Sequence, residues 1–481
     1  MTAAGAQTSR PRRWLKPIGL LIAFALLAIL VLMPVDLFLP GRVALAVFGT
    51  AVILWATTRL DAAWIALAGA VALVLFGAAG QRDVTGMLGD DIIWLMIGAF
   101  VIGTAFETSG LAARLTGAVA ARARTTGQLF WLTTLALIPL TFLIPSTSGR
   151  AAATLPALNA FFGADRGAEA ERGRRAFAIL IPTIILVATT AALTGAGSHL
   201  LAEDLLYQRI GERFGFAQWA LWGLPFALAV SLASCWVVLR LFLSRDERAT
   251  AVPRSSLGQG PMTPAEWKTL AIAAITFGLW FTTAWHGYRI ASVAVLAMIV
   301  LTAPVIGVLK FKAAMKAVNW SLVVFVGAAL LLGQALINTQ AAGWLVGGLF
   351  DITNLDTIRG GDAPAMVVVA AIALISLASH LFMTSHVARM AALGPPFILM
   401  AQTAELNPVA VLFIATAGMN YCLTLPVCSK ALLLFQDVDG VTFRPRDLMR
   451  LSAVLMPVHL VLMIIFYFGW WQWTGLALAA G

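Results

Sequence analysis

Apolar stretches long enough to cross a bilayer recur along almost the whole chain. About 20 residues in an α-helix span the ~30 Å hydrocarbon layer of a membrane. Hydrophobic residues make up 60% of the 481 residues and charged residues 11%, whereas a soluble domain carries about 25% charged residues. The ~10-residue alternating segments of a transmembrane β-barrel do not occur. The chain is therefore predicted to be an all-α polytopic membrane protein.

Lysine and arginine gather in the loops between these apolar stretches. The formal net charge of +10 therefore follows the positive-inside pattern of membrane proteins, and a nucleic-acid partner is not expected. The three cysteines lie in apolar stretches and form no CxxC or Cys/His cluster, so no metal centre or cofactor is expected. The sequence shows no paired carboxylates and no catalytic Ser/His pattern, so an enzyme is not expected.

Taking the basic loops as cytoplasmic predicts about eleven transmembrane helices. The N-terminal segment contains Arg10, Arg12 and Arg13 and is interpreted as a cytoplasmic tail and first span rather than a removed signal peptide. Eleven crossings place the uncharged C-terminus outside. The expected location is the inner (plasma) membrane of a bacterial-type cell.

Two segments are predicted to enter and leave the membrane on one side. Residues 126–163 have arginine-rich flanks, and the flanks of residues 364–402 are acidic on balance, which predicts two opposed re-entrant hairpins. Inverted repeats with broken helices near the midplane are typical of secondary transporters. The predicted division of the chain is a cytoplasmic tail and first span (1–42), a first inverted repeat (43–243), a central cytoplasmic linker (244–264) and a second inverted repeat (265–481).

The two hairpins share one polar motif. "LIPSTSGRAAATLP" (143–156) and "LFMTSHVARMAALGPP" (381–396) place an arginine at the same step. A hairpin tip at mid-membrane exposes the N–H groups and positive end of its second helix, which bind anions, and an arginine fork matches a carboxylate, sulfate or phosphate. Each arginine could instead snorkel or pair with an acid, but their repetition favours anion binding. The predicted substrate-binding residues of the tips are Ser146, Thr147, Ser148, Arg150, Ser385, His386 and Arg389.

Two other spans are interrupted. "ALTGAGSHLLAED" (192–204) and "NYCLTLPVCSKALL" (420–433) carry breaks that would supply carbonyl and hydroxyl ligands opposite the tips. Ser198 and Ser429 are therefore added to the predicted substrate site, with a possible sodium site near Gly195 and Ser429. Whether the coupling ion is Na⁺ or H⁺ stays open. Lys430 is either a third cation at depth or a lysine near the cytoplasmic end that snorkels. His199, His380 and His386 could shuttle protons or be ordinary hydrogen-bonding residues. Glu107 is interpreted as a solvated residue near a cytoplasmic helix end.

At these motifs the chain resembles the divalent anion/sodium symporter (DASS) family of the ion-transporter superfamily. The resemblance covers nearly the whole chain and implies a homodimer in which a transport domain moves as an elevator against a scaffold. It also implies C4-dicarboxylates, citrate or sulfate as substrates. The family's Ser-Asn-Thr tips read Ser146-Thr147-Ser148 and Ser385-His386-Val387 here, so oxygen ligands for sodium are lost where the arginines occur.

The predicted function is secondary active transport of small, divalent anions by elevator-type alternating access, with sodium-independent exchange as an option. The partners expected are a small anionic substrate, the lipid bilayer and a second copy of the chain. An oxyanion or arsenite-type efflux permease is the alternative within the same superfamily. A passive anion channel, lined by basic residues, is the alternative outside it.

Overall fold

The computed structural model describes residues 36–58, 60–120, 122–162, 167–252, 260–345, 364–436, 438 and 442–479. The predicted cytoplasmic tail and nearly all of the predicted first span lie outside these residues. The described part is helical and has two isolated β-bridges but no strand, as predicted. Seven of the described helices are long and apolar enough to cross a membrane, and four shorter apolar helices accompany them. The count of eleven crossings stays a prediction.

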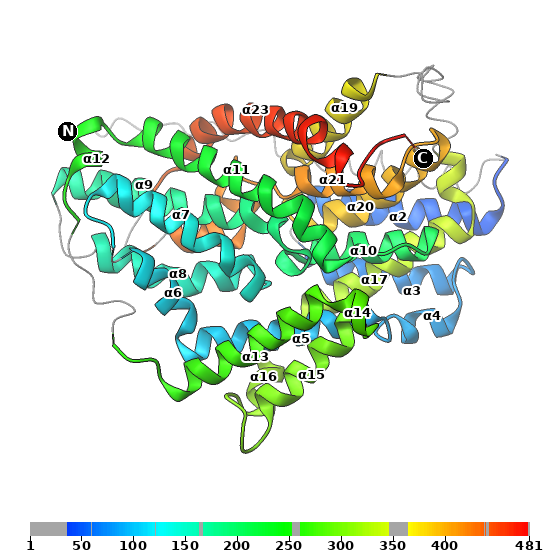
Figure 1. Cartoon of the computed structure of the whole chain (residues 1–481). Coiled ribbons are helices and arrows are strands. Elements are labelled where there is room, and N and C mark those ends of the chain that lie inside the picture. The colour runs from blue at the N-terminus through cyan, green and yellow to red at the C-terminus, as the bar shows by residue number, and fades with distance from the viewer. Residues whose placement is uncertain are drawn as a thin grey trace, which may run out of the picture.

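A similar order of helices occurs twice among the described residues, and Figure 1 labels most of these helices. The first series is α2 (Leu39–Thr57), α3 (Ala62–Leu75), α4 (Gln81–Gly86), α5 (Asp91–Ser109), α6 (Leu111–Ala120), α7 (Thr126–Leu143), α8 (Thr147–Phe162), α9 (Ala168–Val187), η1 (Ala188–Ala191), η2 (Leu193–Gly195), α10 (Gly197–Ile210) and α11 (Phe216–Phe242). The second series is α13 (Pro264–Phe281), α15 (Ile290–Thr302), α16 (Phe311–Ala317), α17 (Trp320–Asn338), α19 (Ala365–Ala378), α20 (His386–Thr403), α21 (Pro408–Met419), η5 (Pro426–Cys428), α22 (Lys430–Gln436) and α23 (Pro445–Gly469). Between and beside them lie the short helices α12 (Arg245–Ala249), α14 (Thr283–His286), η4 (Ser379–Leu381) and η6 (Trp471–Trp473).

The two series interlock rather than standing apart. Helix α3 of the first series packs against α17 of the second, and α15 of the second packs against α5 of the first. In the same way α10 packs against α20, and α22 packs against α8. Small residues permit these close approaches: a Cβ added to Gly98 of α5 would lie 2.7 Å from the Cβ of Ala294 on α15. The hairpin-like pairs of one half are therefore covered by helices of the other half.

Several segments that are far apart in sequence meet at one end of the molecule, which we call the linker end. The N–H of Thr126, at the start of α7, donates to the carbonyl of Thr250 (2.9 Å). Arg114, after α5, binds the Glu266 carboxylate (2.5 Å) and thereby holds the pKa of that carboxyl below its ordinary value. Arg172, at the start of α9, forms an ion pair with Glu247 of the linker.

Other loops meet at the opposite end, which we call the acidic end. Arg213 follows α10 and forms an ion pair with Glu203 (2.9 Å), and Arg289 precedes α15 and forms one with Asp91 at the start of α5. The C-terminal segment reaches the same region, because the Trp222 indole donates to the carbonyl of Thr474 (2.9 Å). The loops predicted to share one side of a membrane thus lie together in space.

This arrangement predicts which loops a membrane-impermeant reagent can reach. Glu171 lies on the exposed surface near the linker end, and Glu405 is exposed between α20 and α21. In a cysteine-free background, Glu171→Cys is expected to react only from the cytoplasmic side and Glu405→Cys only from the outside. Maleimide labelling of right-side-out and inverted vesicles measures this. Labelling of both positions from the same side would contradict the opposed orientation of the two hairpins.

Candidate anion-binding site

The two tips of the helix pairs α7–α8 and α19–α20 have the same local geometry. Ser146 precedes α8 and accepts a hydrogen bond at its Oγ from the N–H of Gly149 (3.2 Å). Ser385 precedes α20 and accepts one from the N–H of Ala388 (3.2 Å). Both serines therefore cap helices. Each keeps one hydroxyl hydrogen that can be donated to a ligand, and both residues are half-buried.

Arg150 joins the first tip to the broken segment after α9. Its side chain is fully buried; Nη1 donates to Thr141 Oγ1 (2.6 Å) and Nη2 donates to the carbonyl of Gly195 (2.9 Å). Only its Nε lacks a partner among the described residues. Two of the three guanidinium nitrogens thus already have partners, and Nη2 holds the break in place.

Arg389 is equally buried but has fewer partners. Its Nη1 donates to the carbonyl of Tyr421 (3.1 Å), whereas Nε and Nη2 have no partner among the described residues. Neither Arg389 nor Arg150 forms an ion pair with any acid that the structure describes. A buried cation without a carboxylate is costly, so an anionic ligand would stabilise this arrangement.

The two predicted breaks adopt one backbone conformation. In each, a short 3-10 turn is flanked by extended residues: Ala192 and Ala196 around η2, and Leu425 and Ser429 around η5. Ser429 accepts a hydrogen bond from the N–H of Ala431 (3.2 Å) and so caps α22. The first break begins earlier than the glycines suggest, at η1.

The predicted site residue Ser198 does not occupy the position that Ser429 occupies. Ser198 lies in the first turn of α10, whereas Ala196 matches Ser429. Its hydroxyl is fully buried and has no partner in the described part of the chain. Thr147 and Ser148 lie in the first turn of α8 and are half-buried, so their hydroxyls and N–H groups remain near the tip. Lys430 begins α22 and is exposed.

An asparagine that the motifs do not single out joins the two halves. Asn420 Nδ2 donates to Thr190 Oγ1 (2.9 Å) and to His199 Nε2 (2.9 Å). The other nitrogen of His199 donates to the carbonyl of Ala192 (3.0 Å). Asn420 and His199 are fully buried. The break of each half is thus tied to the break of the other.

The other two histidines that the sequence analysis singled out, His380 and His386, lie in the second half. His386 Nδ1 donates to the carbonyl of Met419 (3.2 Å), and its Nε2 has no partner among the described residues. His380 Nε2 is 2.6 Å from Thr424 Oγ1, which in turn contacts Ser452 Oγ (2.7 Å). Among His199, His380 and His386, only His386 has a buried ring nitrogen without a partner in the described residues.

Glu107 also lies beside the first tip. A Cβ added to Gly149 would clash with the Glu107 carboxylate, so this carboxylate approaches the N-terminus of α8, where a negative charge is favourable. The residue itself is exposed, as expected for a solvated group, but its position beside the tip was not predicted. Gly103, one turn earlier on α5, lets the tip approach because its added Cβ would be 3.1 Å from Pro145.

Two interlocked helical series, with paired tips and paired breaks, define a membrane transporter rather than an enzyme. A family model described as "Sodium:sulfate symporter transmembrane region" matches residues 14–477. The chain belongs to this family, and it is an anion transporter, as the sequence motifs predicted.

Curated relatives agree with this assignment, and a solved structure shares the fold. A protein described as "Membrane protein" from Cupriavidus necator is 26% identical and aligns with 79% of this chain and 74% of its own. A citrate/succinate antiporter (22% identical) and an L-tartrate/succinate antiporter (24% identical), both from Escherichia coli K12, align with 79% and 78% of this chain and each over 77% of its own. The crystal structure of the YdaH transporter from Alcanivorax borkumensis shares the fold (TM-score 0.51, 16% identity, 95% of this chain and 98% of that one).

Proposed function

We propose that the protein exchanges small divalent carboxylates, of the C4-dicarboxylate or citrate class, across the bacterial inner membrane. The observation that supports this most directly is the pair of fully buried arginines at the matched tips, which have no acid partner among the described residues. Two fixed positive charges suit a divalent anion better than a monovalent one. Two relatives, a citrate/succinate antiporter and an L-tartrate/succinate antiporter, point to the same substrate class.

The two arginines have different roles in this proposal. Arg389 binds the substrate through Nε and Nη2, which have no protein partner in the described residues. Arg150 supports the site by holding the carbonyl of Gly195 and adds its positive charge. The half-buried hydroxyls of Ser146, Thr147, Ser148 and Ser385 bind the substrate from the tips, with His386, Ser198 and Ser429 lining the remaining wall.

Transport follows an elevator-type alternating access in a homodimer. The pairs α7–α8 and α19–α20 are re-entrant hairpins that carry the site, and the α3–α17 and α5–α15 contacts form the scaffold. Both ends of the first hairpin lie at the linker end, which supports its re-entrance. α7 begins there, and Phe162 at the end of α8 lies close to Gly173, next to the Arg172–Glu247 ion pair. The N-terminus is cytoplasmic and the C-terminus lies outside.

Counterflow in proteoliposomes tests this function. Vesicles loaded with unlabelled succinate are expected to accumulate labelled succinate, citrate or tartrate, and empty vesicles are not. Accumulation of sulfate, arsenate or arsenite, without accumulation of any dicarboxylate, would show that the proposed substrate class is wrong. Single-channel currents, or rapid equilibration without loading, would indicate a passive pore.

A further inference from the structure

A pocket at the acidic end combines aromatic and ionisable side chains. Its volume is about 480 Å³, which is within the range of small-molecule sites. None of the predicted anion-site residues, all of which the structure describes, lines it. Its aromatic lining residues are Phe214, Phe216, Trp280, Phe281 and Tyr288, and its ionisable ones are Asp91, Glu203, Arg213 and Arg289. A ligand that fills this pocket therefore needs both an apolar part and charged groups.

The pocket lies between two groups of helices. The ends of α5, α13, α14 and α15 line it from one group, and α10 and the start of α11 line it from the other. In Figure 1, α13, α14 and α15 lie below α10 and α11. Aromatic rings connect the two groups, because the ring of Phe216 on α11 is centred 5.1 Å from the rings of both Trp280 and Phe281 on α13.

Glu203 of α10 supplies a buried acceptor to this pocket. Its side chain is 1% exposed, and its Oε1 accepts a hydrogen bond from Arg213 Nη1 (2.9 Å). Its Oε2 is buried and has no partner among the described residues. A carboxylate oxygen can only accept hydrogen bonds, and leaving a buried one unpaired is costly. A ligand that brings an N–H or O–H donor would remove this cost.

The two arginines of the pocket differ in how firmly they are held. Arg213 binds Glu203, lies 3.9 Å from Asp91 and stacks on the ring of Tyr207, with 3.8 Å between its guanidinium carbon and the ring centre. Arg289 binds Asp91 through Nη1, but its side chain is 66% exposed. Most of its five N–H donors are therefore accessible, and an arginine fork matches a phosphate group.

The surroundings of the pocket are those of a membrane–water interface. Trp285 of α14 is 87% exposed, and the lining residues Phe281 and Tyr288 are exposed as well. Aromatic side chains at the ends of apolar helices are typical of the headgroup level of a bilayer. Farther along α13 and α15, the exposed residues Ile275 and Leu296 are aliphatic. The pocket is therefore expected to lie where lipid headgroups meet acyl chains.

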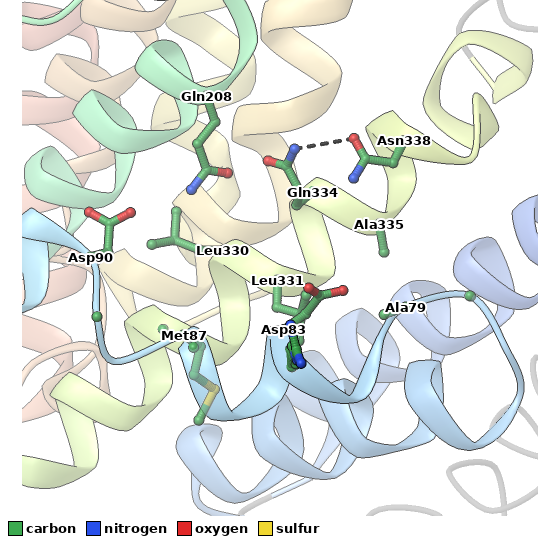
Figure 2. Close-up of a pocket in the computed structure, with 15 residues that line it drawn as sticks. Ala79, Asp83, Met87, Asp90, Gln208, Leu330, Leu331, Gln334, Ala335 and Asn338 are labelled. Carbon is green, nitrogen blue, oxygen red and sulfur yellow. Dashed lines mark hydrogen bonds between the residues drawn. The ribbon is translucent and has the colours of Figure 1, made fainter.

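A larger cavity at the same end has a different lining. Its volume is about 630 Å³, and none of the described residues that line it is aromatic. Figure 2 shows polar side chains around it, among them Asp83, Asp90, Gln208, Gln334 and Asn338. This cavity offers no ring surface to an acyl chain, so it serves as the comparison for the aromatic pocket.

We propose that the aromatic pocket binds a membrane phospholipid whose headgroup carries a phosphate and a primary ammonium, the phosphatidylethanolamine class. The ammonium donates to Glu203 Oε2, the phosphate accepts from Arg289, and the glycerol and upper acyl chain pack against Trp280 and Phe281. This headgroup has no net charge, and the two acids and two arginines of the pocket balance in the same way. A choline headgroup has no N–H donor for Glu203, and a glycerol headgroup has no cation to place beside the carboxylates.

Such a lipid would contact parts of the protein that move relative to each other in the proposed function. α5 and α15 belong to the proposed scaffold, whereas α10 begins directly after the break whose Gly195 carbonyl binds Arg150. A ligand that favours one of two arrangements shifts the population toward it, so the bound lipid is expected to slow exchange. This consequence rests on the proposed function, whereas lipid binding does not.

Native mass spectrometry of the full chain in detergent tests the site with three lipids of identical acyl chains. The parent protein is expected to bind phosphatidylethanolamine at least tenfold more tightly than phosphatidylcholine or phosphatidylglycerol. Glu203→Gln is expected to abolish this preference, because its amide can still accept from Arg213 but offers no second acceptor. Glu212→Gln, which changes an exposed carboxylate just beyond α10, is the matched control and is expected to keep the preference. Equal binding of the three lipids by the parent, or an unchanged preference in a folded Glu203→Gln protein, would overturn the proposal.

Three further variants define the position of the lipid. Arg289→Gln, at an exposed position, is expected to weaken phosphatidylethanolamine binding at least fivefold, and parent-like binding would exclude the phosphate contact. Gln334→Ala in the cavity of Figure 2 is expected to bind like the parent, and a loss there would place the lipid in the other cavity. Trp285→Cys in a cysteine-free background is expected to form no disulfide between two copies. Such a disulfide would show that a second copy of the chain covers the pocket instead.

The effect on transport has its own readout. Counterflow by the parent is expected to be at least threefold slower in vesicles of phosphatidylethanolamine and phosphatidylglycerol than in vesicles of phosphatidylcholine and phosphatidylglycerol. Glu203→Gln is expected to exchange at the same rate, within twofold, in both. Equal rates for the parent would overturn the slowing by bound lipid. Absence of counterflow in either mixture would count against the proposed function, while mass spectrometry would still decide the lipid site.

Discussion

Replacing Arg389 with alanine is expected to weaken dicarboxylate binding and exchange at least tenfold. Nε and Nη2 of this side chain are buried and have no partner among the described residues, so a bound carboxylate would be their first strong acceptor. Removing one partner of a buried charged contact costs roughly 2–5 kcal/mol, and each 1.4 kcal/mol is about tenfold in affinity. Arg389→Lys is also expected to lose affinity, because an ammonium cannot reproduce the planar fork.

The matched change at Arg150 separates binding from support. Nη1 and Nη2 of Arg150 bind Thr141 and the Gly195 carbonyl. Because Arg150→Ala removes both hydrogen bonds, it is expected to lower the melting temperature more than Arg389→Ala does. Arg209→Ala is a control, since this arginine binds the neutral Gln402 side chain at the acidic end. The measurements are substrate affinity by calorimetry, exchange rate and melting temperature. Parent-like affinity in a folded Arg389→Ala protein would exclude direct binding by this residue.

Local sequence patterns predicted the helix starts at the two tips of the candidate site. Ser146 and Ser385 are four residues before an arginine in each half, and both begin a helix after an apolar run. That pattern located the tips and their arginines. It could not tell that the serines are helix caps or that the two guanidinium groups have different numbers of partners. The carbonyl partners, those of Gly195 and Tyr421, come from the distant breaks.

The extent of the first break depends on a neighbouring helix. The carbonyl of Thr190, left free by the 3-10 turn, accepts a hydrogen bond from the Trp219 indole of α11 (2.9 Å). Gly223 of the same helix permits the approach, because a Cβ there would clash with Thr190. No glycine or proline marks residues 188–191, so the sequence placed the break later.

Residues that meet only through packing were also not predicted. Asn420 follows the apolar run of α21 and is a polar residue in a predicted span, which is a signal for function or pairing. Its partners Thr190 and His199, however, belong to the other half of the chain.

Exchange is expected to proceed at the same rate, within twofold, in sodium and in choline medium. A sodium ion in such a site needs several oxygen ligands, and backbone carbonyls of the breaks are the natural source. Here the carbonyl of Gly195 binds Arg150 Nη2 (2.9 Å) and the carbonyl of Tyr421 binds Arg389 Nη1 (3.1 Å). The guanidinium groups thus hold the breaks and supply positive charge, which are the two tasks that sodium would perform.

The same charges explain why exchange should be obligatory. Without a substrate, two buried guanidinium groups would have to cross a low-dielectric region unneutralised, and that step is costly. Proteoliposomes loaded with succinate are therefore expected to take up labelled succinate at least tenfold faster than unloaded ones, in choline as in sodium medium. Vesicles without protein control for leakage. Arg150→Gln is the matched variant, because it weakens the contact with the Gly195 carbonyl while keeping a polar side chain. We expect sodium to stimulate exchange, if at all, in this variant and not in the parent protein. An absolute sodium requirement of the parent would show that sodium binds through carbonyls other than these two.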